Sequence, residues 1–225
     1  MKEKTIEPVA HIRTDFPGKF GIPRQAGIVE ELEGIIEFDK GYSDREAIRG
    51  IEGFSHLWLI WGFSENEGWS PTVRPPRLGG NERRGVFATR SPFRPNGLGL
   101  SCVRLLRVED RGSGMPKLIV AGADMVDGTP IYDIKPYVPY TDCRTDADAG
   151  FAPDSGKHLG VEIPKDVEEQ IPEEKRAALK AVLSLDPRPQ YIEQGDREYG
   201  FGFAGYEIRF IVKDGRIKVI SAVKA

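Results

Sequence analysis

Cysteine and histidine are scarce in this sequence of 225 residues, which has two cysteines and three histidines. Cys102 and Cys143 form no C-x-x-C pair, neither lies near a histidine, and the histidines show no H-x-x-x-H spacing. Disulfide frameworks and zinc sites are normally marked by such spacings. We therefore expect neither a disulfide framework nor a bound metal.

Long hydrophobic runs are also missing. The longest, Leu57 to Phe63, is far shorter than the roughly 20 residues that a transmembrane helix needs. The sequence begins with the charged stretch MKEKTIEP, which contains no apolar signal segment. The expected protein is soluble and cytoplasmic, with no membrane contact.

Three common ligand-site motifs are absent. No G-x-G-x-x-G stretch follows a strand and opens a helix, so a Rossmann dinucleotide site has no support. Neither a G-x-x-x-x-G-K-[ST] phosphate loop nor a G-x-S-x-G elbow occurs. A ligand site in this chain must therefore be built in another way.

Glycine and proline are abundant, with 26 and 17 residues, and they predict many turns. Apolar or alternating stretches favour strands over residues 9–14, 34–38, 55–63, 85–89, 99–110 and 117–126. Many strands joined by short turns, with one short helix, favour a closed or nearly closed β-barrel. The predicted fold class is therefore mainly β.

The composition changes after Tyr140, where aromatics become rare and acids, glycine and proline become common. The end of the chain combines an amphipathic helix with two strands around Asp214-Gly215, a strong hairpin signal. We expect a β-barrel domain over residues 1–145, a boundary region over 146–171 and a small α+β domain over 172–225.

Arginines are concentrated between residues 74 and 104, although the whole chain has a net charge of −3. This stretch contains seven arginines, no lysine and a single acid, Glu82. A guanidinium is planar and binds carboxylate or phosphate through two parallel hydrogen bonds, whereas an ammonium is a point charge. The stretch favours recognition of an anion or of RNA phosphates, and an ordinary solvated surface is the alternative.

Two further segments contain polar residues that could line a ligand site. In GIPRQAG, residues 21–27, Pro23 fixes the backbone so that Arg24 and Gln25 can point into a site. Residues 123–140, which we interpret as a loop, contain aspartates that can accept hydrogen bonds or balance a cation.

Structural explanations stay open for several of these residues. Asp127-Gly128 is also a common turn pair. His56, Trp58, Trp61 and Phe63 lie in the apolar strand and suit a core better than a ligand site.

Taken together, these segments resemble the TrmO family, also called the TsaA-like or YaeB-like family. The shared stretches are FGIPRQAG, IRGIEGFSHLWLIW, PTVRPPRLGGN, GVFATRSPFRPN and DMVDGTPIYDIKPY, followed by DPRPQY and FAGYEIRF. The resemblance implies transfer of a methyl group from S-adenosylmethionine (SAM) to N6 of threonylcarbamoyladenosine at position 37 of tRNA. It also implies a SAM-binding barrel unrelated to the Rossmann methyltransferases, and a homodimer.

The matching motifs imply residue roles. The cofactor is expected to contact Pro23, Arg24, Gln25, Ser64, Glu65, Arg90, Leu100, Asp124, Met125, Val126 and Asp127. The tRNA substrate is expected to contact Arg74, Arg77, Arg94, Lys135 and Tyr137. Asp133, Asp142 and a tyrosine are all candidates for a general base, and the sequence does not choose among them.

Gly97 departs from the family pattern, which usually has proline at this position. We therefore expect Gly97→Pro to leave SAM affinity unchanged or improved. Two other functions stay open at this point: a non-catalytic RNA-binding protein that uses the arginines, and a SAM-dependent methyltransferase that acts on a different acceptor.

Overall fold

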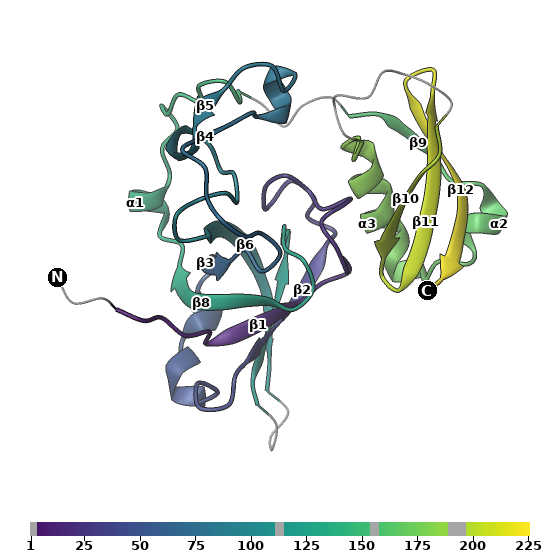
Figure 1. The fold of residues 1–225 in the computed structure, drawn as a ribbon. Coiled ribbons are helices and arrows are strands. Elements are labelled where there is room, and N and C mark those ends of the chain that lie inside the picture. The colour runs from purple at the N-terminus through teal and green to yellow at the C-terminus, as the bar shows by residue number, and fades with distance from the viewer. Residues whose placement is uncertain (1–3, 111–114, 154–157, 189–196) are drawn as a thin grey trace.

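The computed structural model describes residues 4–110, 115–153, 158–188 and 197–225, which form two bodies side by side (Figure 1). The first is a closed barrel with the strand order β1-β2-β7-β6-β3-β8. Its strands are β1 (Ala10–Arg13), β2 (Glu33–Phe38), β3 (His56–Gly62), β6 (Leu98–Glu109), β7 (Lys117–Ala121) and β8 (Thr129–Pro136). All of these strand pairs are antiparallel. The predicted barrel is confirmed.

The barrel core is filled by one face of each strand. In β3, Leu57, Leu59 and Trp61 are buried, whereas Trp58 and Ile60 are only half-buried. The nearly continuous apolar run over residues 55–63 predicts a strand buried on both faces, and this prediction is wrong. Its alternation instead follows from the period of two along a strand, with one face inside the barrel and one outside.

Two local predictions differ from the structure. Thr129–Pro136 is strand β8, which closes the barrel between β1 and β3, and not part of a loop. Of residues 85–89, only Gly85 lies in a strand, and a 3-10 helix covers Val86–Ala88. Asp-Gly and two prolines around β8 gave strong turn signals, but the pairing with two neighbouring strands outweighs this local preference.

Short elements connect the barrel strands. They are the 3-10 helices at Arg45–Ile48, Ile51–Gly53, Pro76–Leu78 and Val86–Ala88, helix α1 (Pro139–Asp142), and the small sheet of β4 (Thr72–Val73) and β5 (Arg84–Gly85). The arginine-rich stretch therefore forms a folded excursion between β3 and β6.

The second body is a four-stranded sheet packed with two helices. The sheet has the order β10-β11-β12-β9 and comprises β9 (Gly160–Glu162), β10 (Tyr199–Phe203), β11 (Tyr206–Lys213) and β12 (Arg216–Lys224). The helices are α2 (Lys165–Glu168) and α3 (Glu173–Ser184). The hairpin at Asp214-Gly215 is confirmed, with φ angles of 51° and 71° at these residues. β9 pairs with β12, so the C-terminal sheet begins inside the segment 146–171.

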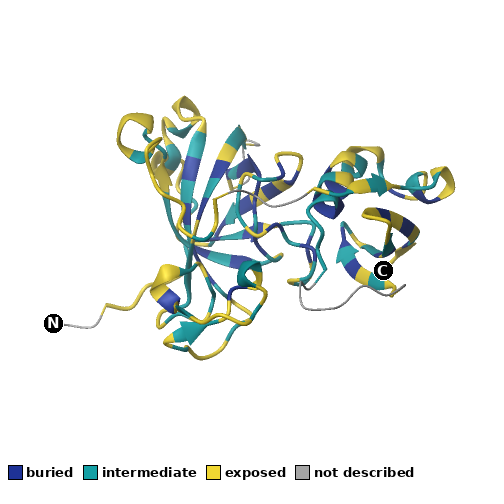
Figure 2. Cartoon of the chain, turned by 90° about the horizontal axis from the view of Figure 1, so that it is seen from above, coloured by how far each residue is buried: buried dark blue, intermediate teal, exposed yellow. Residues whose placement is uncertain are grey.

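The loop between β1 and β2 belongs to the core of the C-terminal body. Phe16, Val29 and Leu32 are buried in the same cluster as α3 and the C-terminal strands. The Phe16 ring meets the Phe203 ring edge-on at 5.5 Å, and Lys175 Nζ lies 2.7 Å from Asp15 Oδ2. Figure 2 shows buried residues in both bodies. The two bodies are therefore joined by apolar packing as well as by the chain that links them.

Among the residues that the structure describes, no helix is long and apolar enough to cross a membrane.

Replacing Phe16 by alanine tests the shared core. We expect Phe16→Ala to lower the free energy of unfolding by about 3–5 kcal/mol, because it removes a buried aromatic and leaves a cavity. Urea unfolding followed by circular dichroism measures the change. The matched control is Phe87→Ala, since Phe87 is 75% exposed. Equal stability of the two variants would show that the loop does not belong to this core.

Candidate functional site

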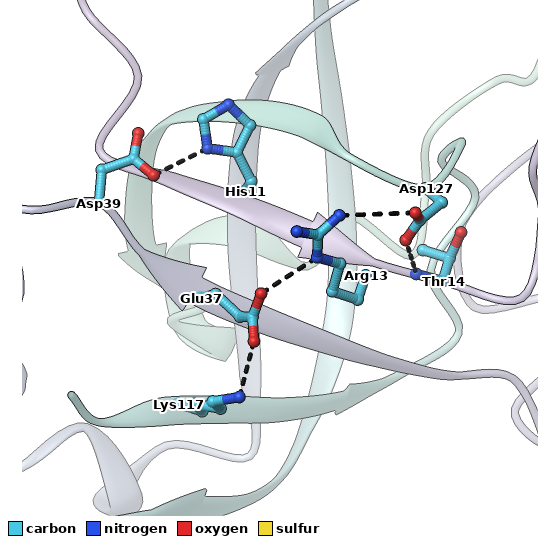
Figure 3. A network of polar contacts seen from close by, with 7 residues as sticks. All are labelled: His11, Arg13, Thr14, Glu37, Asp39, Lys117 and Asp127. Carbon is cyan, nitrogen blue, oxygen red and sulfur yellow. Dashed lines mark hydrogen bonds and ion pairs between the residues drawn. The ribbon is translucent and has the colours of Figure 1, made fainter. Parts of the chain in front are cut away.

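Three cavities in the described parts of the chain are compared by what lines them. The first, of about 710 Å³, lies against β1, β2 and β7 and is lined by charged side chains. These side chains pair with one another (Figure 3): Glu37 binds both Arg13 and Lys117, and His11 Nδ1 lies 2.8 Å from Asp39 Oδ1. Hydrogen bonds from Lys117 and Arg13 lower the pKa of Glu37 below its ordinary value. This network connects neighbouring strands, and its charged groups already have partners within the network.

The second cavity, of about 530 Å³, lies between the two bodies. The third, of about 280 Å³, lies where the arginine-rich excursion meets β6 and the loop before β2. Its lining residues are Pro23, Arg24, Gln25, Trp61, Phe63, Thr89, Arg90, Arg94, Leu98, Gly99, Leu100 and Asp124. Apolar walls with a few converging polar groups are typical of small-molecule sites. We take this third cavity as the candidate functional site and call it the barrel-end cavity.

Backbone contacts hold the GIPRQAG loop against the barrel. Gly27 N–H donates to the carbonyl of Gly122 at 2.8 Å, and Gly122 N–H donates to that of Leu32 at 2.8 Å. A Cβ at Gly122, whose φ is +80°, would lie 3.0 Å from the Gly27 backbone. Only glycine combines this φ with so close an approach. The contact places Pro23, Arg24 and Gln25 at the wall of the barrel-end cavity.

The arginine-rich loop is held by its own side chains. Arg94 Nη1 donates to the carbonyls of Thr89 and Val86 at 2.7 and 3.2 Å, and its guanidinium lies 5.6 Å from the Phe87 ring centre. Arg94 therefore shapes the loop from inside. Arg90, by contrast, reaches across the cavity and donates to Gln25 Oε1, which joins the two loops.

Asp124 provides the acidic wall. Its Oδ1 accepts a hydrogen bond of 2.6 Å from Ser101 Oγ, and Ser101 Oγ accepts one of 3.0 Å from Trp61 Nε1. Burial raises the pKa of Asp124 above its ordinary value, against the hydrogen bonds from Ser101 and Ala26 N–H and the charge of Arg90, which lower it. A carboxylate in this position can accept from a cationic or hydroxyl group of a ligand.

The chemistry of the lining suits SAM. Its carboxylate matches the guanidinium groups of Arg24 and Arg90, and its ammonium or ribose hydroxyls match Asp124. Trp61 and Phe63, whose ring centres are 4.4 Å apart, form an aromatic wall for a nucleobase.

Six of the eleven predicted cofactor residues line the barrel-end cavity: Pro23, Arg24, Gln25, Arg90, Leu100 and Asp124. The other five are Ser64, Glu65, Met125, Val126 and Asp127, and they do not line it. The carbonyl oxygen of Glu65 accepts from Lys19 Nζ at 2.5 Å. Met125 is buried in the barrel core, and Ser64 follows β3.

Asp127 and Val126 serve the turn before β8. The Asp127 carboxylate accepts from Thr14 N–H at 3.0 Å and lies 3.6 Å from Arg13 Nη1 (Figure 3). The Val126 carbonyl accepts from the Thr129 hydroxyl at 2.7 Å. Asp127 therefore connects β1 to the turn before β8, and Val126 stabilises that turn from within.

The predicted tRNA contacts fall in four places. Arg94 lines the barrel-end cavity, and Arg77 lines the cavity between the two bodies. Arg74 is exposed between β4 and the helix Pro76–Leu78. Lys135 pairs with Asp133 at 2.9 Å, and the Tyr137 ring packs 5.7 Å from Trp58 on the outer side of β3.

Sequence reasoning assigned Trp61 and Phe63 to the core and did not single out Thr89, Leu98, Gly99 or Ser101. Trp61 is both a core residue and a cavity residue: its side chain is 7% exposed, and it lines the cavity. It faces Gly99 across the β3–β6 pair, where a Cβ would lie 2.3 Å from the indole. A tryptophan opposite a glycine on paired strands is a signal that becomes readable only once the register is known.

Among the described residues, no three His, Cys, Asp or Glu side chains are grouped so that they could hold a metal ion.

The described residues form a closed antiparallel barrel in place of a Rossmann fold, and the barrel-end cavity combines basic, acidic and aromatic side chains that suit SAM. This combination indicates a SAM-binding barrel protein of a different class from the Rossmann methyltransferases. The tRNA-methyltransferase O N-terminal domain matches residues 11–143, and the TrmO C-terminal domain matches residues 156–225. The chain belongs to the TrmO family.

Relatives agree with this assignment over most of the chain. A tRNA (adenine(37)-N6)-methyltransferase of Escherichia coli K12 is 40% identical over 233 residues, covering 98% of each chain. One of Eikenella corrodens is 42% identical over 175 residues, or 76% of this chain and 98% of that protein. The crystal structure of TrmO from Pseudomonas aeruginosa has a TM-score of 0.81 and 31% identity, covering 100% of this chain and 99% of that one.

A more distant relative carries the cofactor in its name. A "Probable S-adenosyl-L-methionine-binding protein" of Pyrococcus abyssi is 39% identical over 144 residues, which is 64% of this chain and 73% of that protein.

Gly97 requires a correction to the expectation drawn from the sequence. Its φ is +58°, its N–H donates to the Arg94 carbonyl at 3.2 Å, and its carbonyl accepts from Phe63 N–H at 2.9 Å. Proline fixes φ near −65° and has no N–H. We therefore reverse the expectation that proline is tolerated here: the loop adopts a conformation that excludes it.

We expect Gly97→Ala to lower the free energy of unfolding by about 1–2 kcal/mol, because an L-residue is strained at this φ, and Gly97→Pro to cost more. Both variants should also weaken SAM binding, because Phe63 and Arg94 line the cavity. The control is Gly85→Ala, where φ is −58° and a Cβ meets nothing within 4 Å. Urea unfolding and calorimetric SAM titration provide the measurements, and a neutral Gly97→Pro would contradict this backbone conformation.

Proposed function

We propose that the protein transfers a methyl group from SAM to N6 of the adenine at position 37 of tRNA, with threonylcarbamoyladenosine as the acceptor. The observation that carries this proposal is the barrel-end cavity, which gathers six of the cofactor residues expected from the family motifs. Family membership covers both bodies of the chain and supports the same reaction.

The residues of this chain contribute mainly by positioning. Bound SAM supplies an electrophilic methyl group. Arg24 and Arg90 can bind its carboxylate, and Asp124 can accept from its ammonium or ribose hydroxyls. Fixing donor and acceptor in one geometry removes much of the entropic barrier of a bimolecular displacement. This proposed mechanism needs no covalent step on the protein.

The cavity between the two bodies is a suitable place for the part of the tRNA that flanks the base at position 37. It shares Pro23 and Arg24 with the barrel-end cavity, so the two cavities have a common wall. Its lining also contains Lys19, Arg77 and Arg188, which favour an anionic partner. We propose that the C-terminal body holds the tRNA from this side, and that Arg74, Lys135 and Tyr137 contact it farther out.

The DPRPQY stretch contributes to the same cavity. Asp186 and Arg188 line it, and they pair through two hydrogen bonds of 2.7 and 2.8 Å. The last three residues of the stretch, 189–191, lie outside the described residues. The pair fixes the planar guanidinium of Arg188 at the cavity wall.

The identity of the general base stays open, but the contacts of Asp142 and Asp133 disfavour both as bases. Hydrogen bonds from Val138 N–H and Trp58 Nε1 lower the pKa of Asp142 below its ordinary value, which makes it a weaker base. The Asp133 carboxylate forms an ion pair with Lys135 and accepts a hydrogen bond from the Ile134 N–H. Loss of the acceptor proton to water is compatible with both observations.

We also propose that the protein works as a homodimer in the cytoplasm, as the family resemblance implies. Large apolar side chains are exposed on the arginine-rich excursion, with Phe87 75%, Trp69 58% and Phe93 43% exposed. Sedimentation of the purified protein tests the dimer.

Binding and activity are tested on the same preparation. SAM is titrated by calorimetry, and transfer of a labelled methyl group is measured on tRNA with and without the threonylcarbamoyl group. We expect transfer only to the modified tRNA. Absence of SAM binding, with salt-dependent RNA binding retained, would instead favour a non-catalytic RNA-binding protein. Transfer only to unmodified tRNA would refute the proposed acceptor.

Arg90 and Arg77 line different cavities and therefore make a matched pair. We expect Arg90→Ala to weaken SAM binding by about 10- to 100-fold, the value of one or two charge-assisted hydrogen bonds. Arg77→Ala should change SAM affinity less than threefold and reduce tRNA affinity instead. Calorimetry for SAM and filter binding for tRNA separate the two effects. Equal losses of SAM affinity at both positions would show that this division of the arginines is wrong.

A further inference from the structure

A chain of three polar side chains runs from the barrel core to the barrel-end cavity. Trp61 Nε1 donates to Ser101 Oγ at 3.0 Å, and Ser101 Oγ donates to Asp124 Oδ1 at 2.6 Å. Ser101 is only 2% exposed, and Trp61 is 7% exposed. The hydroxyl therefore has no access to bulk water, and its hydrogen bonds are set by these two neighbours.

The chemistry of the three groups fixes the direction of the chain. An indole N–H can only donate, so Ser101 Oγ must accept from Trp61. The single hydroxyl proton of Ser101 then points at Asp124. A distance of 2.6 Å is typical of a hydroxyl bound to an ionised carboxylate. The backbone N–H groups of Ala26 and of Asp124 itself also donate to this carboxylate, so three donors stabilise its anionic form.

This stabilisation opposes the free-energy cost of burying a charged carboxylate. Burial alone raises the pKa of Asp124 and favours the neutral acid. The charged side chains that line the cavity with Asp124 are Arg90, Arg24 and Arg94, and Arg90 acts in the same direction as the three donors. Removal of a donor shifts this balance further toward the neutral acid.

Packing shows that the chain is built into the barrel. Trp61 can reach Ser101 because Gly99, its partner across the β3–β6 pair, has no side chain, and a Cβ there would overlap the indole. Ser101 follows two residues later on the same inward face of β6. The register of β3 and β6 thus places Trp61 and Ser101 so that their hydrogen bonds lead to Asp124.

We propose that Trp61 and Ser101 are positioning residues that hold Asp124 as a carboxylate anion facing the barrel-end cavity, where it receives the cationic or hydroxyl groups of SAM. The inference rests on the proposed function for the identity of the ligand, but the state of Asp124 can be measured without it. Ser101 does not line the cavity and acts through Asp124, whereas Trp61 contributes its N–H to this chain and its ring to the cavity wall. Trp61→Phe keeps an aromatic ring at the wall and removes only the N–H.

The first measurement is the titration of Asp124 in the ligand-free protein, followed by carboxyl-carbon NMR. We expect Ser101→Ala and Trp61→Phe to shift the Asp124 midpoint to higher pH, because each weakens the stabilisation of the anion. Ser101→Thr, which keeps a hydroxyl, should stay close to the wild type. An unchanged midpoint in Ser101→Ala would overturn the proposed chain.

The second measurement is SAM affinity between pH 5 and 8 by calorimetry. At pH 7 we expect the dissociation constant to rise about tenfold in Ser101→Ala and about threefold in Trp61→Phe. Affinity falls as pH drops through the Asp124 midpoint, so this decline should begin at higher pH in both variants. Ser101→Thr should restore affinity to within about threefold of the wild type.

The structure offers a matched control on the same strand. Trp58 Nε1 also donates to an aspartate, Asp142 Oδ2 at 3.0 Å, but on the outer side of the barrel. Trp58→Phe removes the same kind of bond and should leave SAM affinity and its pH dependence unchanged. A loss equal to that of Trp61→Phe would refute the specific role of the inner chain.

Asp124→Asn separates positioning from stability. Burial raises the pKa of Asp124 in the folded protein above its unfolded value, so the ionised form opposes folding at neutral pH. We expect Asp124→Asn to unfold at an equal or higher urea concentration while its SAM affinity falls at least tenfold. Reduced stability would contradict this account.

The two hypotheses fail in different ways. If even the wild type does not bind SAM, the proposed function fails, and the Asp124 titration still tests the chain. If the wild type binds SAM but Ser101→Ala binds it equally well with the same pH dependence, only the positioning role fails. Circular dichroism checks that each variant is folded, and Trp61→Phe keeps the test decisive should Ser101→Ala not fold.

Discussion

The close approach of two backbone segments at Gly27 and Gly122 is the constraint on which the site depends. The hydrogen bond between them is 2.8 Å long, and a side chain at Gly122 would collide with the Gly27 backbone. This contact brings the loop with Arg24 and Gln25 against the strand connection that carries Asp124. Without it, the basic and acidic walls of the barrel-end cavity would belong to segments with no fixed relation. The cavity is thus a product of glycine at two positions far apart in sequence.

The same loop ties the cavity to the C-terminal body. Phe16 lies before the cavity residues and Val29 after them, and both are buried in the C-terminal core. A Cβ at Gly21 would also lie 2.5 Å from the Phe201 ring, so the loop fits closely against β10. Removal of the C-terminal body would expose apolar side chains on the very loop that lines the barrel-end cavity. Loss of activity in such a truncation would therefore not separate tRNA binding from cofactor binding, and single-residue variants are the cleaner probe.

The sequence predicts the barrel, the C-terminal hairpin and half of the cavity lining, because each of these has a local signal. Alternating apolar residues mark the strands, Asp214-Gly215 marks the turn, and proline beside arginine marks the first loop. β8 was missed because turn-forming residues surround a strand whose stability comes from its two neighbours. The roles of Trp61 and Ser101 depend on the register between β3 and β6, which no local pattern specifies. Long-range pairing, more than composition, decides what the sequence alone leaves open.

The concentration of arginines has two physical meanings in the folded chain. Several arginines serve the excursion itself: Arg84 pairs with Glu82 at 2.7 Å, Arg83 binds Thr72 at 2.8 Å, and Arg94 binds loop carbonyls. Arg90 is exposed but faces the acidic wall, and its positive charge favours the ionised form of Asp124. A cavity with opposite charges on opposing walls favours a ligand that carries both signs, and it disfavours a simple anion, which Asp124 would repel. The methionine end of SAM, with its carboxylate and ammonium, is such a ligand, whereas an RNA phosphate is not. The arginine-rich stretch can therefore contact RNA along its exposed side and still reserve its inner side for the cofactor.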